Sequence, residues 1–334
     1  MLAAASGNVF ATPEWHEQWL AWAGAEPLLH GLRDESGVLR AVLPLVRERI
    51  GPIRLLRYSG HGPGDENGPV CAPADRESAV AGVQELLGRA GHHVFIGEQL
   101  PQWAAAGRVL TREGSPVVRI DGQSWDELLA ARSRNFRDQA RRRERKLGRE
   151  HDLQFRLSDG DHLDVDLTTL FRLHRARWGG DQTSFSRREA FYRGFAAVAQ
   201  ERGWLRLWLI ELDGVPAAAW LGFRYGNSDS YYQLGRDPAW DSASVGFVLL
   251  AHTIREAAAD GRHEYRFLRG DESYKYRFAD EDPGLVTVGV ARGPVGAVAL
   301  TAAVGLRAAR QRARQTTAAI SAARSSSGRS ASSR

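Results

Sequence analysis

Between residues 204 and 278, apolar and polar positions follow an order that predicts strands, then a helix, then another strand. Three runs rich in apolar and aromatic residues come first: Leu205–Leu212, Val215–Tyr225 and Ser230–Gly235. Asp213-Gly214 separates the first two runs, and this dipeptide is the strongest short-range signal for a tight β-hairpin. The segment therefore predicts antiparallel strands joined by short turns.

The pattern becomes helical after the third run. From Val245 to Asp260 apolar residues recur at helical spacing, which places them on one face of a helix, and Gly261 follows as a typical stop. Tyr265 to Leu268 then predicts a short strand, and the polar, aromatic segment Arg269–Phe278 predicts a turn. With two helices expected upstream, over residues 163–178 and 185–201, the order is helix, helix, three antiparallel strands, helix, strand.

The first 121 residues carry their own series of elements. Residues 12–23 predict a helix with three tryptophans on one face, and strands and a second helix follow up to Ile120. The glycine-rich loop Ser59–Pro69 lacks the Lys-Ser/Thr ending of a phosphate-binding P-loop. We expect this loop to line a cleft, with Asp65 as its carboxylate of interest. Residues 1–121 therefore predict a self-contained α+β domain.

Asp121-Gly122 marks a break, and a second domain is expected over residues 122–292. The remaining residues, 293–334, are basic and rich in serine, arginine and alanine. Such a segment cannot bury enough apolar surface to fold alone. We expect this tail to be disordered or partly helical.

Composition narrows the class of protein. The chain has 334 residues, 43% of them apolar, which suffices for two cores. The single cysteine, Cys71, excludes an internal disulfide framework and a multi-cysteine zinc site, and we expect no metal. No apolar run reaches the roughly 20 residues that span a bilayer, and Met1–Phe10 lacks the features of a signal peptide. These observations favour a cytoplasmic protein without an integral membrane segment.

The net charge of +5 is concentrated in two places, the segment Arg132–Arg149 and the tail. Clusters of this kind can bind phosphate, whether of nucleic acid, lipid or a cofactor. They are more often a solvated helix face and a disordered tail, and we favour this second interpretation.

The chain contains a set of short phrases: Ser133–Arg137, His174–Trp178, Gly203-Trp204, Asp213–Ala217, Gly235–Pro238, Val245-Gly246 and Gly270–Lys275. Together these phrases resemble the CelD/BcsL-type acetyltransferase family of the GNAT fold, a relative of the Fem-type peptidoglycan aminoacyltransferases. The resemblance covers roughly residues 10–278 and is strongest after Gln123. It implies an α+β protein with two tandem GNAT-like domains, each a mixed, mostly antiparallel sheet flanked by helices.

The resemblance also implies a reaction, in which an acyl group passes from acyl-CoA, such as acetyl-CoA, to an amine or hydroxyl by direct attack. In a GNAT site the donor lies between two parting strands, and its pyrophosphate binds the N-terminus of the next helix. Carried over to this chain, the strand that polarises the acyl carbonyl would be Gln233, Leu234 and Gly235. The pyrophosphate turn would be Ser244, Val245, Gly246 and Phe247.

The catalytic candidates are Asp271, Tyr274, Lys275 and Tyr232. Attack by an amine needs a base that works near neutral pH, and a buried carboxylate or tyrosine can serve. The alternative is a turn in which Asp271 caps backbone N–H groups and Lys275 pairs with Glu272. Tyr231 and Tyr232 point to opposite faces of their strand, so either one can face the cleft.

Three functions stay open at this stage. The first is acyl transfer to a small amine or to a cell-envelope or exopolysaccharide precursor. The second is Fem-like transfer from aminoacyl-tRNA, which the arginine-rich segment Arg132–Arg149 favours. The third is a non-catalytic scaffold for polysaccharide assembly.

Overall fold

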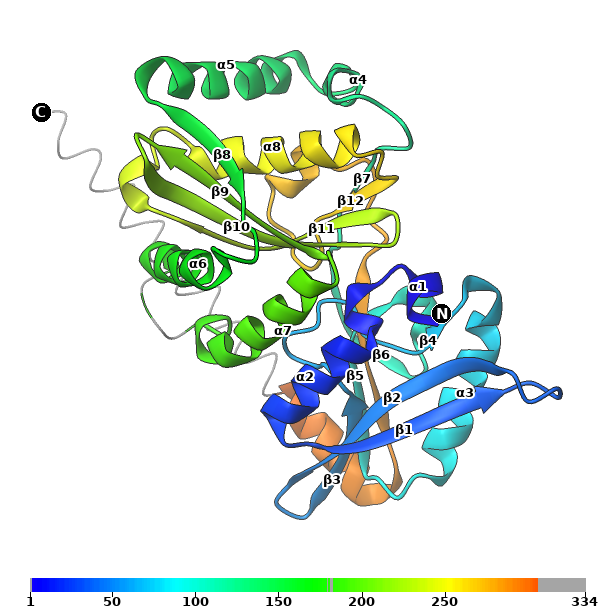
Figure 1. The fold of residues 1–334 in the computed structure, drawn as a ribbon. Coiled ribbons are helices and arrows are strands. Elements are labelled where there is room, and N and C mark those ends of the chain that lie inside the picture. The colour runs from blue at the N-terminus through cyan, green and yellow to red at the C-terminus, as the bar shows by residue number, and fades with distance from the viewer. Residues whose placement is uncertain (1, 179, 181–182, 306–334) are drawn as a thin grey trace, which may run out of the picture.

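The computed structural model describes residues 2–178, 180 and 183–305, and it contains two β-sheets (Figure 1). The first sheet has the order β1-β2-β3-β5-β13-β6, with β4 paired to β2. Its strands are β1 (Glu26–Arg33), β2 (Leu39–Ile50), β3 (Ile53–Tyr58), β4 (Val70–Cys71), β5 (Val94–Pro101), β6 (Arg108–Glu113) and β13 (Leu285–Ala291). We call it sheet A.

Sheet B has the order β7-β12-β11-β10-β9-β8. Its strands are β7 (Val117–Arg119), β8 (Leu153–Leu157), β9 (Leu205–Leu212), β10 (Val215–Tyr225), β11 (Ser228–Arg236) and β12 (Glu264–Arg266). In the two sheets only the β3–β5 and β11–β12 pairs are parallel, among the strands that the structure describes. Both sheets are therefore mixed and mostly antiparallel, which confirms the predicted fold class.

Helices cover both sheets. They are α1 (Leu2–Ser6), α2 (Pro13–Ala23), α3 (Arg76–Arg89), α4 (Trp125–Ala130), α5 (Arg134–Glu150), α6 (Leu163–Trp178), α7 (Glu189–Glu201) and α8 (Val245–Ala259). Helices α4, α5 and α8 pack on one face of sheet B, and α2, α6 and α7 contribute to the core on the other face (Figure 1). Helix α3 packs on sheet A. None of the described helices is long and apolar enough to cross a membrane.

The two sheets exchange strands. Strand β7, from the sequence range expected for the first domain, pairs with β12 in sheet B. Strand β13, from the range expected for the second, lies between β5 and β6 in sheet A. Residues 293–305 then form a helix, whose Ala299 and Leu300 pack against sheet A. The rest of the expected tail, residues 306–334, lies outside the described part.

Local chemistry explains where several elements begin and end. Asp213 and Gly214 both have positive φ, as the tight turn between β9 and β10 requires, so the predicted hairpin is confirmed. Thr12 caps α2 by accepting the Trp15 N–H, and Ser124 and Glu127 form a capping box at α4. These caps satisfy N–H groups that a helix cannot pair by itself.

Helix α6 lies directly on β11. A Cβ atom added at Gly235 would fall 2.5 Å from the His174 backbone nitrogen and 2.8 Å from the Leu170 carbonyl. Only glycine permits this approach. As a result, the last turn of α6 is held against the second half of β11.

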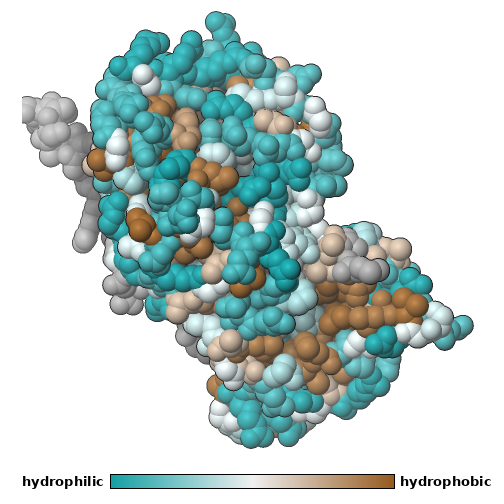
Figure 2. All heavy atoms as spheres, viewed as in Figure 1, coloured by the Kyte–Doolittle hydropathy of each residue, from teal (hydrophilic) through white to brown (hydrophobic). Residues whose placement is uncertain are grey.

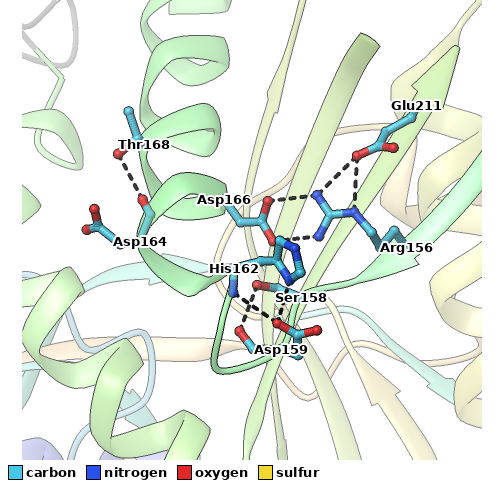
Figure 3. A network of polar contacts seen from close by, with 8 residues as sticks. All are labelled: Arg156, Ser158, Asp159, His162, Asp164, Asp166, Thr168 and Glu211. Atoms are coloured by element: carbon cyan, nitrogen blue, oxygen red, sulfur yellow. Dashed lines mark hydrogen bonds and ion pairs between the residues drawn. The ribbon is translucent and has the colours of Figure 1, made fainter. Parts of the chain in front are cut away.

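The other end of α6 is fixed by a charged network (Figure 3). Arg156 of β8 donates two hydrogen bonds of 2.8 Å to Asp166 of α6, and it also contacts Glu211 of β9. The Asp166 side chain is only 3% exposed, and its carboxylate is the main cause that raises the pKa of Arg156. One guanidinium therefore ties an edge strand, its neighbour and a helix together.

We predict that Arg156→Leu lowers the free energy of unfolding by about 3 kcal/mol, because it leaves the Asp166 carboxylate buried without a countercharge. Urea unfolding measures this change. The matched control is His162→Gln, since His162 and Asp159 form an exposed pair of the same network (Figure 3), and the loss of such a pair should leave the free energy of unfolding nearly unchanged. Equal effects of the two substitutions would contradict this prediction.

Candidate functional site

Strands β11 and β12 part after a short parallel ladder. They pair only over Ser228–Ser230 and Glu264–Arg266, and β11 then continues alone on this side to Arg236. On its other side, β11 carries a bulge against β10, because Leu221 opposes Gln233 while Gly222 opposes Tyr231. The bulge leaves Tyr232 as the extra residue and bends the strand. The gap that the sequence led us to expect is therefore present.

Two adjoining cavities lie at this gap. One, of about 270 Å³, reaches the N-terminus of α8, and we call it the helix-end cavity. The other, of about 290 Å³, reaches the glycine-rich loop after β3, and we call it the loop cavity. Both are lined by Arg177, Tyr231, Leu234 and Tyr274, so these side chains lie between the two spaces.

The lining of the helix-end cavity is predominantly basic. The expected pyrophosphate turn, residues Ser244, Val245, Gly246 and Phe247, lines it at the start of the 15-residue helix α8. Unpaired N–H groups and the helix dipole favour negative charge at this position. Four arginines also line the cavity: Arg143, Arg177, Arg236 and Arg277.

Acidic residues do little to offset these arginines. Among the lining residues that the structure describes, Asp241 is the one acid, and it pairs with Arg236. Burial and the neighbouring Arg277 lower the pKa of Arg143. An anion bound here would relieve the repulsion between these guanidinium groups.

Aromatic rings hold two of the arginines in place. The Arg143 guanidinium of α5 lies 4.9 Å from the ring centroid of Phe247, and Arg277 lies 4.9 Å from that of Phe136. Such cation–π contacts orient a guanidinium without neutralising its charge. The side chains remain able to bind a negatively charged ligand.

A hydrogen bond from Arg177 shows which backbone groups of β11 face the gap. It donates a 3.3 Å hydrogen bond to the Leu234 carbonyl, which faces the gap. A residue in an antiparallel strand directs its N–H and its C=O to the same side. The Leu234 N–H therefore points toward the gap too, where it can polarise a carbonyl oxygen.

The loop cavity contains a buried carboxylate. Asp65 is 7% exposed, and its Oδ1 lies 3.5 Å from Nε of Arg269. Burial raises the pKa of Asp65 in spite of this arginine, while Asp65 is the main cause that raises the pKa of Arg269. The two pKa shifts are consistent with each other. Desolvation destabilises the charged Asp65 carboxylate by more than the attraction of one guanidinium at 3.5 Å stabilises it.

Lys275 and Tyr274 line the same space. Lys275 is 2% exposed, and its Nζ donates to the Arg269 carbonyl at 2.7 Å and pairs with Glu272 at 2.9 Å. The Tyr274 hydroxyl donates to Tyr231 at 3.2 Å. Burial raises the pKa of Tyr274, so this hydroxyl keeps its proton at neutral pH.

Other expected residues are placed differently. Asp271 does not line either cavity; its carboxylate accepts the Gly114 N–H at 2.6 Å. Tyr232 lines the loop cavity, but its hydroxyl donates to the Pro63 carbonyl at 2.7 Å. Tyr231, on the opposite face of β11, is the member of this tyrosine pair that lines both cavities. Gln233 lines the loop cavity, and Gly235 packs against α6.

Sequence reasoning did not single out Arg177, Arg236, Arg277 or Arg269, which come from the end of α6, β11 and the turn after β12, and no short motif links them. Arg143 of α5 lay inside the basic segment Arg132–Arg149, for which a solvated helix face was favoured. A weak signal existed, because Arg177 and Arg236 stand inside two of the phrases that carry the family resemblance.

Residues 134–276 match the family described as "Acetyltransferase (GNAT) domain". This segment is a GNAT domain. The match spans α5 to the turn after β12, and so includes the gap and the N-terminus of α8. A comparison with curated proteins gives no match.

Solved structures extend the likeness to both sheets. FemX has a TM-score of 0.60 at 12% identity, over 84% of this chain and 92% of its own. The C-terminal domain (DUF2156) of a putative lysylphosphatidylglycerol synthetase from Agrobacterium fabrum has a TM-score of 0.56 at 14% identity, over 87% and 95%. L-PGS from Bacillus licheniformis has a TM-score of 0.55 at 12% identity, over 89% and 96%. At these identities the likeness is one of fold, and it confirms the expected tandem GNAT-like architecture and its relation to the Fem-type fold.

We predict that Asp65→Asn raises the melting temperature at pH 7 by a few degrees. A carboxyl whose folded pKa is raised stabilises the protein while protonated, and this contribution is lost as pH rises through the folded pKa. The neutral amide avoids the loss, so the advantage of the variant should shrink as pH falls toward 4. Thermal melts between pH 4 and pH 8 measure it, with the exposed Glu77→Gln as the control. A variant less stable than wild type at pH 7 would contradict this account.

Proposed function

We propose that the protein is an acyltransferase that moves an acyl group from acyl-CoA, acetyl-CoA among them, to an amine or hydroxyl. The observation that supports this most is the gap after Ser230. It opens onto the helix-end cavity, which contains the N-terminus of α8 and four arginines from other elements. A donor with a diphosphate at one end and a thioester at the other fits this arrangement of charge. Such a donor is met in the cytoplasm.

In this proposal the donor lies along the second half of β11. Its diphosphate is held by the first N–H groups of α8 with Arg236 and Arg277. Its thioester carbonyl accepts the Leu234 N–H, which stabilises the negative charge that develops as the acceptor attacks. Tyr274, which lines both cavities, is placed to give its proton to the leaving thiolate.

The acceptor occupies the loop cavity. Asp65 is the base that we assign there, because burial raises its pKa and so makes it a better proton acceptor than an exposed carboxylate. Lys275 and Glu272 shape the cavity wall through their ion pair, and Asp271 holds the turn against Gly114. The resemblance to CelD/BcsL-type proteins favours an acceptor from cell-envelope or exopolysaccharide synthesis.

A second donor, aminoacyl-tRNA, is favoured by α5. Figure 2 shows that the upper surface, where Figure 1 draws this helix, is strongly hydrophilic. Arg142 and Arg149 of α5 make no hydrogen bond or ion pair with other described residues, and Arg143 of the same helix reaches the helix-end cavity. A row of free arginines beside the donor site can follow a nucleic-acid backbone.

We predict that acetyl-CoA binds with a dissociation constant that rises about tenfold or more in Arg236→Ala and Arg277→Ala, because each removes a charge-assisted contact with phosphate. Titration calorimetry measures this change. Arg49→Ala, at an exposed position on β2, is the control. Failure of acetyl-CoA and of longer acyl-CoAs to bind the wild-type protein would remove the CoA donor.

The salt dependence of tRNA binding tests the second donor. If tRNA is the donor, its affinity falls steeply with salt, and the slope flattens in an Arg142→Ala, Arg149→Ala double variant. A slope that does not respond excludes the tRNA donor. Absence of both kinds of binding would favour a non-catalytic scaffold instead.

A further inference from the structure

The helix of residues 293–305 exposes an apolar face. It contains no charged residue along its whole length, whereas the solvent-facing side of a surface helix normally carries charged side chains. Leu300 points inward and packs on the core cluster that contains Leu55 of β3. Val298 lies on the outer side and is 71% exposed, and Val295, three residues earlier, is 49% exposed. The outer side of this helix therefore presents valines to its surroundings without a charge among them.

The turn between β2 and β3 adds a third apolar side chain at the same end of sheet A. Ile50 is 67% exposed and lies opposite Ile53, which packs on the same core cluster as Leu300. Figure 1 draws the helix of residues 293–305, in orange, next to β3. We call Ile50, Val295 and Val298 together the apolar end of sheet A.

Arginines flank the apolar end. Arg49 and Arg54 lie directly opposite each other in the hairpin whose tip carries Ile50, and like charges in such a pair destabilise a sheet. Neither side chain makes an ion pair or a hydrogen bond with another residue that the structure describes. Arg292 comes directly before the helix, and its guanidinium donates to the Ala90 carbonyl at 3.3 Å. Negative charge supplied from outside would relieve the repulsion in the hairpin.

The hairpin arginines also line a cavity. It has a volume of about 390 Å³, and its lining includes Arg47, Arg49 and Arg54. Both of the acids that line it, Glu26 and Glu48, pair with arginines, at 3.1 Å and 3.3 Å. The space therefore has guanidinium groups to spare, and guanidinium is the group that best matches a phosphate.

Positive charge continues along the chain beyond the helix. From Pro283 to Arg334 the sequence contains eight arginines and no aspartate or glutamate. Segments of this kind are attracted to anionic surfaces. The apolar helix face is therefore both preceded and followed by cations in the sequence.

We infer that this end of sheet A binds the surface of a membrane that contains anionic phospholipid. The apolar end enters the boundary between headgroups and acyl chains, while Arg49, Arg54 and Arg292 bind lipid phosphates. A nucleic acid would satisfy the arginines but leave the apolar side chains in water, and an apolar protein surface would leave the arginines without a countercharge. The inference does not depend on the proposed acyl transfer, because other residues line the helix-end cavity and the loop cavity.

Co-sedimentation of the full chain with lipid vesicles tests the inference. Vesicles of phosphatidylcholine are compared with vesicles in which one third of the lipid is phosphatidylglycerol. We expect the wild-type protein to bind the vesicles with phosphatidylglycerol more tightly. This preference should weaken as salt is added, because salt screens the attraction between arginine and lipid phosphate.

A charge on the apolar end should weaken binding. Val298→Glu is expected to lower the affinity for the anionic vesicles about tenfold, since it places a carboxylate against anionic headgroups. The matched control is Val165→Glu on α6, because Val165 is 66% exposed and the substitution changes the net charge equally.

Loss of the hairpin arginines should have a similar effect. The double variant Arg49→Gln, Arg54→Gln is expected to bind the anionic vesicles about tenfold more weakly. Its control is Arg172→Gln, Arg187→Gln, which removes two exposed arginines from another part of the surface. Melting curves confirm that each variant is folded. All variants keep residues 306–334, so a difference between a variant and its control comes from the substituted surface and not from the tail.

Two results would overturn the inference. One is wild-type protein that binds both kinds of vesicle equally or binds neither. The other is an affinity for the anionic vesicles that stays within twofold of the matched control, either in Val298→Glu or in the double variant of Arg49 and Arg54.

Discussion

The feature that shapes the site is the absence of pairing with another described strand along one edge of the second half of β11. A strand inside a sheet normally pairs on both sides, and an unpaired backbone group that is also buried carries a free-energy cost. Here β12 supports β11 only from Ser228 to Ser230. The rest of β11 is held on one face by the packing of Gly235 against α6, and it keeps a free edge toward the two cavities. Because α8 follows β11 in the chain, the helix N-terminus lies beside that edge.

The site belongs to both sheets. The exchange of β7 and β13 links the two sheets, since each sheet is completed by a strand from the sequence range expected for the other domain. This connection brings Asp65 and Glu113 to cavity walls formed otherwise by β11 and the turn after β12. A GNAT domain consisting of residues 134–276 alone would have the arginine-lined end of the cleft but would lack these two carboxylates.

The two cavities differ in the charge of the residues that line them. The helix-end cavity has four arginines against one acid, Asp241, whereas the loop cavity has three cations and three carboxylates. Tyr231 and Tyr274 stand between them with a hydrogen bond of 3.2 Å. Buried charges of this kind oppose folding, and proteins keep them where binding or catalysis needs them. The Arg156 network shows the opposite use of buried charge, in which both partners are satisfied and an element is held in place.

What the sequence by itself determined is local. The Asp213-Gly214 hairpin, the helix from Val245 and the glycine-rich loop at a cleft follow from spacing and turn chemistry, because these act over a few residues. The mixed sheets were expected from the family resemblance. Only the tertiary structure decided which strand completes which sheet, which tyrosine of the pair Tyr231 and Tyr232 reaches both cavities, and that Arg269 would meet Asp65. The cause is distance along the chain, because contacts such as Arg269 to Asp65 join segments about 200 residues apart and leave no period or motif in the sequence.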